Sequence, residues 1–88
     1  MNVRVNHPTD RPNFTRVDVG ELTIWFSYET QIAFHTYETG TVVHENDWGP
    51  TTGKHLNAID GGDKKSRVTR EAFDAAFREQ FGREAAAA

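Results

Sequence analysis

The chain has 88 residues, of which 36% are hydrophobic and ten are aromatic, and its formal net charge is −3. A chain of this length forms one small domain whose core depends on a few large side chains. The absence of cysteine excludes disulfides and thiolate metal sites, and no apolar run approaches the roughly 18 residues of a membrane-spanning helix, so we expect a soluble, cytoplasmic protein.

Charge is segregated along the chain. Residues 17–53 carry six acidic residues and no lysine or arginine, whereas residues 54–70 carry five basic residues against two acidic ones. An acidic middle followed by a basic segment creates a directional field on a small domain. Such a field suits electrostatic pairing with another protein or with a second copy of the chain.

The N-terminal residues 1–13 show no hydrophobic periodicity and contain prolines, which predicts an extended or flexible arm with at most a short strand from Val3 to Val5. From residue 14, apolar and polar residues alternate in the manner of β-strands, with breaks at residues 20–21 and 29–31. Gly40 fits the left-handed position of a three-residue hairpin loop. Short connections of this kind predict an antiparallel meander of three to four strands.

A helix is predicted from Thr69 to Phe81, with Thr69 as its N-cap and Gly82 as its end. Its apolar residues recur at helical spacing and form one stripe: Ala72, Phe73, Ala76, Phe77 and Phe81. We therefore expect a single α+β domain over residues 14–82, in which this C-terminal helix packs on one face of the sheet. Residues 83–88 are expected either to continue this helix or to form a frayed tail.

The segment 46–62 is the most unusual part of the chain, because it combines a tryptophan, a proline, four glycines, a lysine, a histidine and two asparagines. A short helix is predicted from Thr52 to Ile59. Its free N–H groups at residues 53–55, beside Lys54 and His55, would form an anion site. The alternative is that the threonines only cap the helix, Lys54 is solvated and His55 bonds to the backbone.

Basic residues after this helix offer a second hypothesis, in which Lys54 and the 64–70 loop bind a nucleic-acid backbone and Trp48 stacks on a base. The usual role of such a loop is a solvated surface. Two strand histidines, His35 and His44, have the chemistry of zinc ligands, but the expected hairpin register staggers them, so we expect no metal site. His55 and Asp60 lack a recognisable nucleophile, so we expect no enzyme and no cofactor.

Three stretches carry a resemblance to a known family: Ser27-Tyr28-Glu29-Thr30-Gln31-Ile32-Ala33-Phe34, then Asn46-Asp47-Trp48, then Thr51-Thr52-Gly53-Lys54-His55-Leu56-Asn57 with Ile59-Asp60. They are similar to those of a family of small uncharacterised proteins encoded by bacteriophages, plasmids and some bacteria. The resemblance covers residues 20–80 and implies no activity, cofactor or site residue. It implies a phage or mobile-element setting, in which binding to a host or virion protein is more plausible than metabolism.

Together these observations predict a non-enzymatic interaction module that binds itself or another protein through the acidic sheet surface and the 46–62 loop. Nucleic-acid or phosphate binding through Lys54, His55 and the 64–70 loop is the alternative. Four aromatic residues are candidate interface anchors, namely Trp25, Tyr28, Tyr37 and Trp48. The candidate binding residues are Trp48, Thr52, Lys54, His55, Asn57, Lys64, Lys65 and Arg67.

Overall fold

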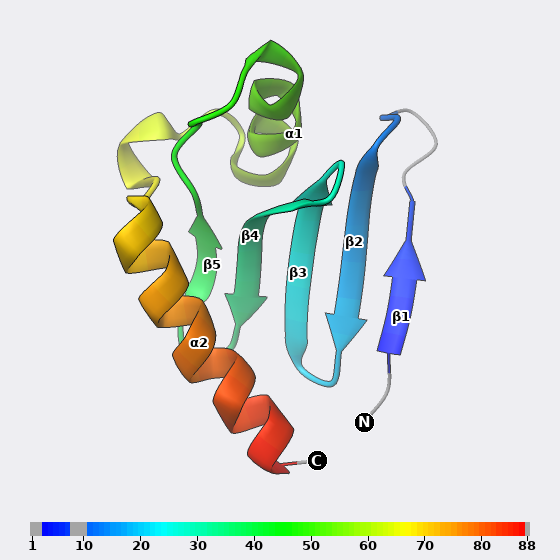
Figure 1. Ribbon diagram of the computed structural model, residues 1–88, viewed down its shortest axis with the longest axis vertical. Helices are drawn as coiled ribbons and strands as arrows, with labels where there is room; N and C mark the ends of the chain where they lie inside the picture. The colour runs from blue at the N-terminus through cyan, green and yellow to red at the C-terminus, as the bar shows by residue number, and fades with distance from the viewer. Residues whose placement is uncertain (1–2, 8–10, 88) are drawn as a thin grey trace.

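A computed structural model describes residues 3–7 and 11–87 of the chain, and the side chains only as far as residue 83. The fold is α+β, as expected: five antiparallel strands form one sheet in the order β1-β2-β3-β4-β5, with two α-helices and one short 3₁₀-helix after them. Figure 1 shows the strands side by side in chain order, with one helix at an end of the sheet and the other along it.

The sheet has one strand more than the three to four we expected. The strands are β1 (Val3–Asn6), β2 (Phe14–Val19), β3 (Leu22–Ser27), β4 (Thr30–Thr36) and β5 (Gly40–Val43). The additional strand is β1, which pairs antiparallel with β2 over its whole length. Four exposed residues give a weak sequence signal on their own, so the pairing with β2 could not be predicted from them.

The turns follow the expected breaks. Gly20 and Gly40 both have positive φ, at 59° and 67°, where a side chain would be strained. The β3–β4 turn differs, because its first residue, Tyr28, has a φ of 56° although it is not a glycine. The register also shifts between β3 and β4, where Trp25 faces Ala33 while the next residue, Phe26, faces Gln31. This β-bulge leaves Ile32 as an additional residue in β4.

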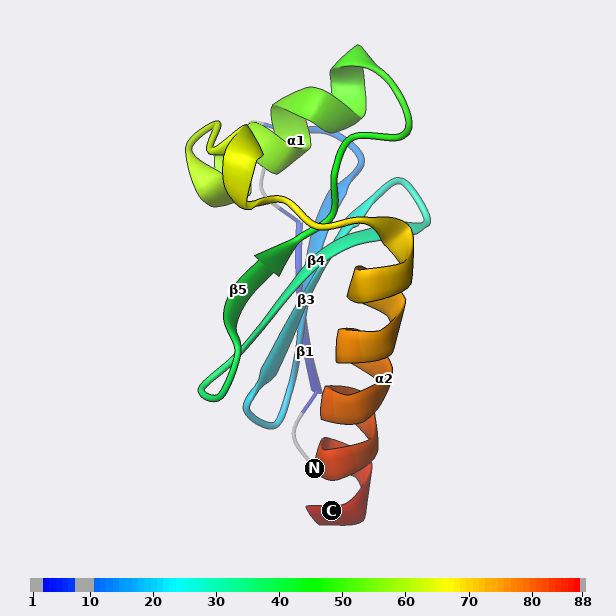
Figure 2. The same ribbon diagram turned by 90° about the vertical axis from the view of Figure 1, so that its left-hand side faces the viewer.

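The bulge directs consecutive residues Ile32 and Ala33 into the same core cluster, together with Phe14 and Val43. Leu56 from the helix α1 (Pro50–Asp60) completes that cluster, so α1 covers one end of this sheet face. The opposite face is covered by α2 (Arg70–Ala87). Figure 2 shows the two helices on opposite sides of the sheet.

On the α2 face, Phe73 and Phe77 each make an edge-on contact with Phe34 of β4. Thr69 caps the helix as predicted, because its Oγ1 accepts a hydrogen bond from the N–H of Ala72. The predicted end at Gly82 is wrong, since the helix continues to Ala87. The alanines beyond Gly82 favour the helical conformation and compensate for one glycine in its interior. Neither α-helix of the described chain is long and apolar enough to cross a membrane.

Candidate functional site at helix α1

The 46–62 segment folds into α1 and its flanking turns, and the helix begins two residues earlier than predicted. Pro50 occupies its first turn, and the N-cap residue Gly49 makes no side-chain cap. The N–H of Gly53 donates to the carbonyl of Gly49, so it is not available to an anion as we had expected. The predicted stop is confirmed, because Gly61 ends the helix in the left-handed conformation.

Thr52 and His55 turn inward rather than toward a ligand. Both side chains are buried and meet Ser27 at the end of β3. The Ser27 Oγ lies 2.9 Å from the Thr52 Oγ1 and 2.7 Å from the His55 Nδ1. The His55 ring also stacks on Phe14, with ring centroids 4.9 Å apart. These contacts attach α1 to β2 and β3.

His55 bonds to Ser27 through its Nδ1, and the backbone of Pro12 is a further hydrogen-bond partner of its ring. Ser27 also bonds to Thr52, so one hydroxyl links the two buried side chains of α1. The pKa of His55 lies below its ordinary value of 6.5, chiefly because burial disfavours the imidazolium; the Pro12 bond opposes this shift and the charge of Arg11 adds to it.

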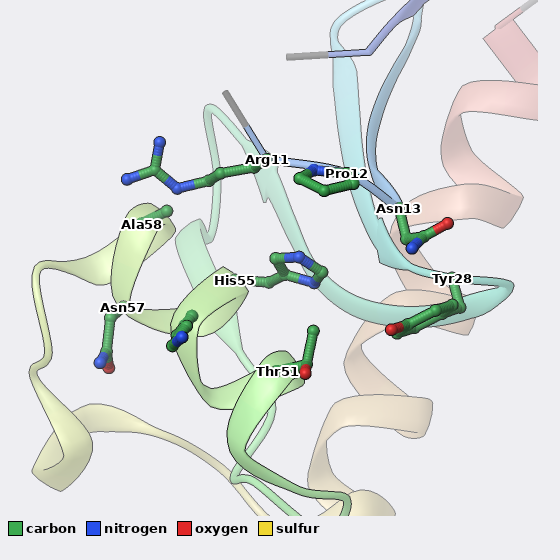
Figure 3. A pocket seen from close by; sticks show the side chains of 9 residues that line it. Arg11, Pro12, Asn13, Tyr28, Thr51, His55, Asn57 and Ala58 are labelled. Atoms are coloured by element: carbon green, nitrogen blue, oxygen red, sulfur yellow. The ribbon is translucent and has the colours of Figure 1, made fainter. Parts of the chain in front are cut away.

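A cavity of about 640 Å³ lies beside this network, between α1, the segment 11–13 and the β3–β4 turn. Figure 3 shows Arg11 and Tyr28 on opposite sides of His55, with the Tyr28 hydroxyl directed toward α1. We call this cavity the α1 pocket. Among the described residues that line it, two are cationic and none is acidic; these residues are Arg11, Pro12, Asn13, Tyr28, Thr51, Lys54, His55, Asn57 and Ala58.

Two residues of the α1 pocket hold unfavourable backbone conformations. Asn13 and Tyr28, with φ of 64° and 56°, are the only non-glycine residues with positive φ in the described part of the chain. A hydrogen bond of 2.7 Å from the N–H of Tyr28 to the carbonyl of Asn13 joins them. Asparagine tolerates this region, whereas tyrosine does so at a cost of about 1–2 kcal/mol. Such strain is found preferentially at ligand sites.

Arg67 is not a free cation, contrary to its assignment as a binding residue. Its Nε and Nη2 donate to the two carboxylate oxygens of Asp60 at 2.7 and 3.0 Å, and both side chains are nearly buried. Its Nη2 also donates to the Asn57 Oδ1 at 2.9 Å. These bonds lower the pKa of Asp60 and fix the turn after α1.

A second, polar hollow of about 380 Å³ lies on the other flank of α1. Lys54 and Asn57 line both this hollow and the α1 pocket, while Lys64 lines only the second. Lys65 is exposed but lines neither. The structure brings Lys54, Asn57 and Lys64 together around one helix, and it adds Arg11, Asn13 and Ser27, which were not among the site residues predicted from the sequence.

Trp48 lies away from these residues. It is 38% exposed and packs on the buried ring of His44, with ring centroids 4.7 Å apart. His35 and His44 have different surroundings, because His35 is exposed and bonds to Thr41 whereas His44 is buried against Phe73. Within the described residues no group of three or more histidine, aspartate or glutamate side chains could hold a metal ion.

The fold and the site together define a small α+β protein with a cationic pocket formed where a helix closes the end of an antiparallel meander. The chain belongs to a family of unknown function, DUF8033, whose family model matches residues 1–75. The match includes the whole sheet, α1 and the α1 pocket. Neither the curated proteins nor the solved structures contain a match to this chain.

Proposed function

We propose that this protein is a non-enzymatic interaction module whose α1 pocket binds an acidic segment of a partner protein. The observation that carries the proposal is the composition of the pocket, in which Lys54 lies on the same lining as the exposed aromatic ring of Tyr28. Cationic groups beside an exposed aromatic ring suit a segment that presents carboxylates next to apolar side chains.

The internal network favours binding over catalysis. Ser27 and His55 have the spacing of a nucleophile and its base, but only 2% of the Ser27 surface is exposed. Its oxygen is also surrounded by Thr52 and His55, so a substrate has no path to it. The network instead supplies a rigid floor for the pocket, and rigidity lowers the entropic cost of binding.

The conformation of Tyr28 supports the same proposal. A left-handed tyrosine costs free energy that glycine or asparagine at this turn would avoid. The side chain is 55% exposed, so core packing does not account for the choice. A role in contacting a partner would account for it, because tyrosine provides much contact area with little loss of conformational freedom.

The acidic sheet surface contributes less to the proposal than the charge pattern along the chain suggested. Three of the six acids in residues 17–53 are paired with arginines: Asp18 with Arg16, Glu38 with Arg83 and Asp47 with Arg70. The last two arginines come from α2, which only the folded structure brings to the sheet. We therefore propose the α1 pocket, rather than the sheet surface, as the main site of partner binding.

We further propose where the partner protein comes from. The resemblance to proteins of bacteriophages and plasmids suggests a host or virion protein, met in the cytoplasm of the host. Self-association is the second candidate, since Val3 and Val5 of the edge strand β1 are 63% and 55% exposed. Light scattering over a range of concentrations tests it, and a monomer at the highest concentration would contradict it.

A titration with a fluorescent acidic peptide tests the main proposal, using glutamates interspersed with leucine and tyrosine as the probe. We expect Lys54→Glu to reduce the affinity about three- to tenfold, since it removes one ion pair and adds a repulsion. Lys65→Glu makes the same charge change outside the pocket and should have little effect. A single-stranded oligonucleotide that binds more tightly than the peptide, with a steep loss of affinity in salt, would instead support the phosphate-binding alternative.

A further inference from the structure

We infer that the partner segment is extended and carries two acidic groups, one in the α1 pocket and one in the second hollow across α1. This inference rests on the proposed function and specifies the ligand of the same site. Its starting point is that Lys54 and Asn57 line both cavities, so these are neighbours on one continuous surface.

Helical geometry places the shared residues between the two cavities. At 3.6 residues per turn, Thr51, His55 and Ala58 follow one flank of α1, while Gly53 and Asn57 follow the other. Lys54 projects between these flanks, opposite the buried side that carries Leu56. Gly53 allows the Asn46 side chain to lie against this part of the helix, since a Cβ there would meet the Asn46 amide nitrogen at 3.0 Å.

Asn57 has a fixed orientation on this surface. Its Oδ1 accepts a hydrogen bond from Arg67, whose guanidinium is itself held by two bonds to Asp60. The Asn57 side chain is exposed, and the end of it that does not bond to Arg67 is the amide nitrogen, which is a hydrogen-bond donor. A donor in this place suits a carbonyl or carboxylate oxygen of a chain that crosses the helix. Arg67 is thus a positioning residue, and Asn57 is the residue that contacts the partner.

The charges of the second hollow favour an acid there. No ion pair joins Lys54 or Lys64 to a carboxylate in the described part of the chain. Arg67 also lines the hollow but is neutralised by Asp60, and Glu45 is the one acid among the described residues that line it. Two lysines therefore face one glutamate, which leaves a net positive charge.

The size of the helix sets the spacing of the two acidic groups. An α-helix with its side chains is about 10 Å across, and an extended chain covers this distance in about three residues. Two acidic clusters separated by a spacer of about three residues can therefore reach both cavities at once. Engagement of both raises the affinity through effective concentration, without any contact beyond the two sites.

Two synthetic peptides test this inference. The first has glutamate pairs at both ends of a serine–glycine–serine spacer, and the second has glutamines in place of one pair. We expect the first peptide to bind more tightly, and Lys64→Glu to reduce its affinity about three- to tenfold. Glu45→Gln should raise the affinity of the first peptide. Both variants should change the affinity of the second peptide less than that of the first, and Lys65→Glu is the matched control for charge.

The outcomes separate the inference from the proposed function. Equal affinity of the two peptides, with no effect of Lys64→Glu, would overturn the inference while leaving the α1 pocket as a binding site. If the acidic peptide that contains leucine and tyrosine also failed to bind, the proposed function itself would be contradicted. A third variant, Asn57→Asp, keeps an acceptor for Arg67 but removes the outward donor, so it should weaken the first peptide with thermal stability retained.

Discussion

The hydroxyl of Ser27 lies 2.7 Å from the Nδ1 of His55, inside the protein, and this contact joins the last residue of β3 to the middle of α1. The two residues are separated by 28 positions in the chain. The sheet and the helix that forms the α1 pocket are thus connected by a polar bond as well as by apolar packing. This relationship makes the stability of the protein sensitive to a few internal polar groups.

Replacing Ser27 with alanine should lower the free energy of unfolding by about 1–3 kcal/mol, because the Nδ1 of His55 and the hydroxyl of Thr52 would lose their partner in the interior. Chemical denaturation measures this change. Ser66→Ala is the matched control, since its hydroxyl bonds to Asp63 at an exposed position and should matter by less than about 0.5 kcal/mol. Equal effects of the two substitutions would contradict a structural role for the network.

The stability should decline in mildly acidic solution because of His55. Its pKa in the folded state is lowered from 6.5, so the unfolded chain binds more protons than the folded one near and below that pH. Stability is therefore fully present above pH 6.5 and is lost as the pH falls below it. Denaturation at a series of pH values measures the slope. His55→Gln should reduce this slope, whereas His35→Gln, at an exposed site, should preserve it.

The Asp60–Arg67 pair should require arginine specifically. Arg67→Lys retains the charge but cannot bond to both carboxylate oxygens and to Asn57 at once, so we expect a loss of about 1.5–3 kcal/mol. Arg70→Lys is the control, because Arg70 makes one exposed contact of 3.3 Å with Asp47. Equal decreases in melting temperature for the two variants would contradict a specific role for the hydrogen bonds to both carboxylate oxygens.

Tyr28→Asn should separate binding from stability. Asparagine tolerates positive φ better than tyrosine, so the free energy of unfolding should be unchanged or rise by up to about 1 kcal/mol. Affinity for the acidic peptide should fall at least about fivefold, because a hot-spot aromatic residue contributes more than about 1 kcal/mol. Tyr37→Asn removes an equally large ring from a position that is 91% exposed and should change neither quantity. Unchanged peptide binding by Tyr28→Asn would remove Tyr28 from the site.

Sequence patterns predicted the parts of the fold that depend on local periodicity. Alternation identified the strands from Phe14 onward, and the spacing of Phe73 and Phe77 identified the face of α2 that packs on the sheet. Phe81 of the same predicted stripe is 46% exposed, so the stripe extends less far than expected. The site was harder to predict, because Arg11 and Tyr28 are separated from α1 in the chain and lie beside it only in the folded structure. Periodicity contains no signal for a tyrosine with positive φ. The inward rotation of His55 likewise depends on Ser27, a distant residue.

Backbone amide chemical shifts, recorded while the acidic peptide is added, test the central claim most directly. If the α1 pocket binds the peptide, the largest changes should fall on Asn13, Tyr28, Lys54 and Ala58, and they should vanish in the Lys54→Glu variant. Changes confined to β1 or β5, or none at peptide concentrations that saturate the fluorescence signal, would show that the partner binds elsewhere and would contradict the assignment of this pocket.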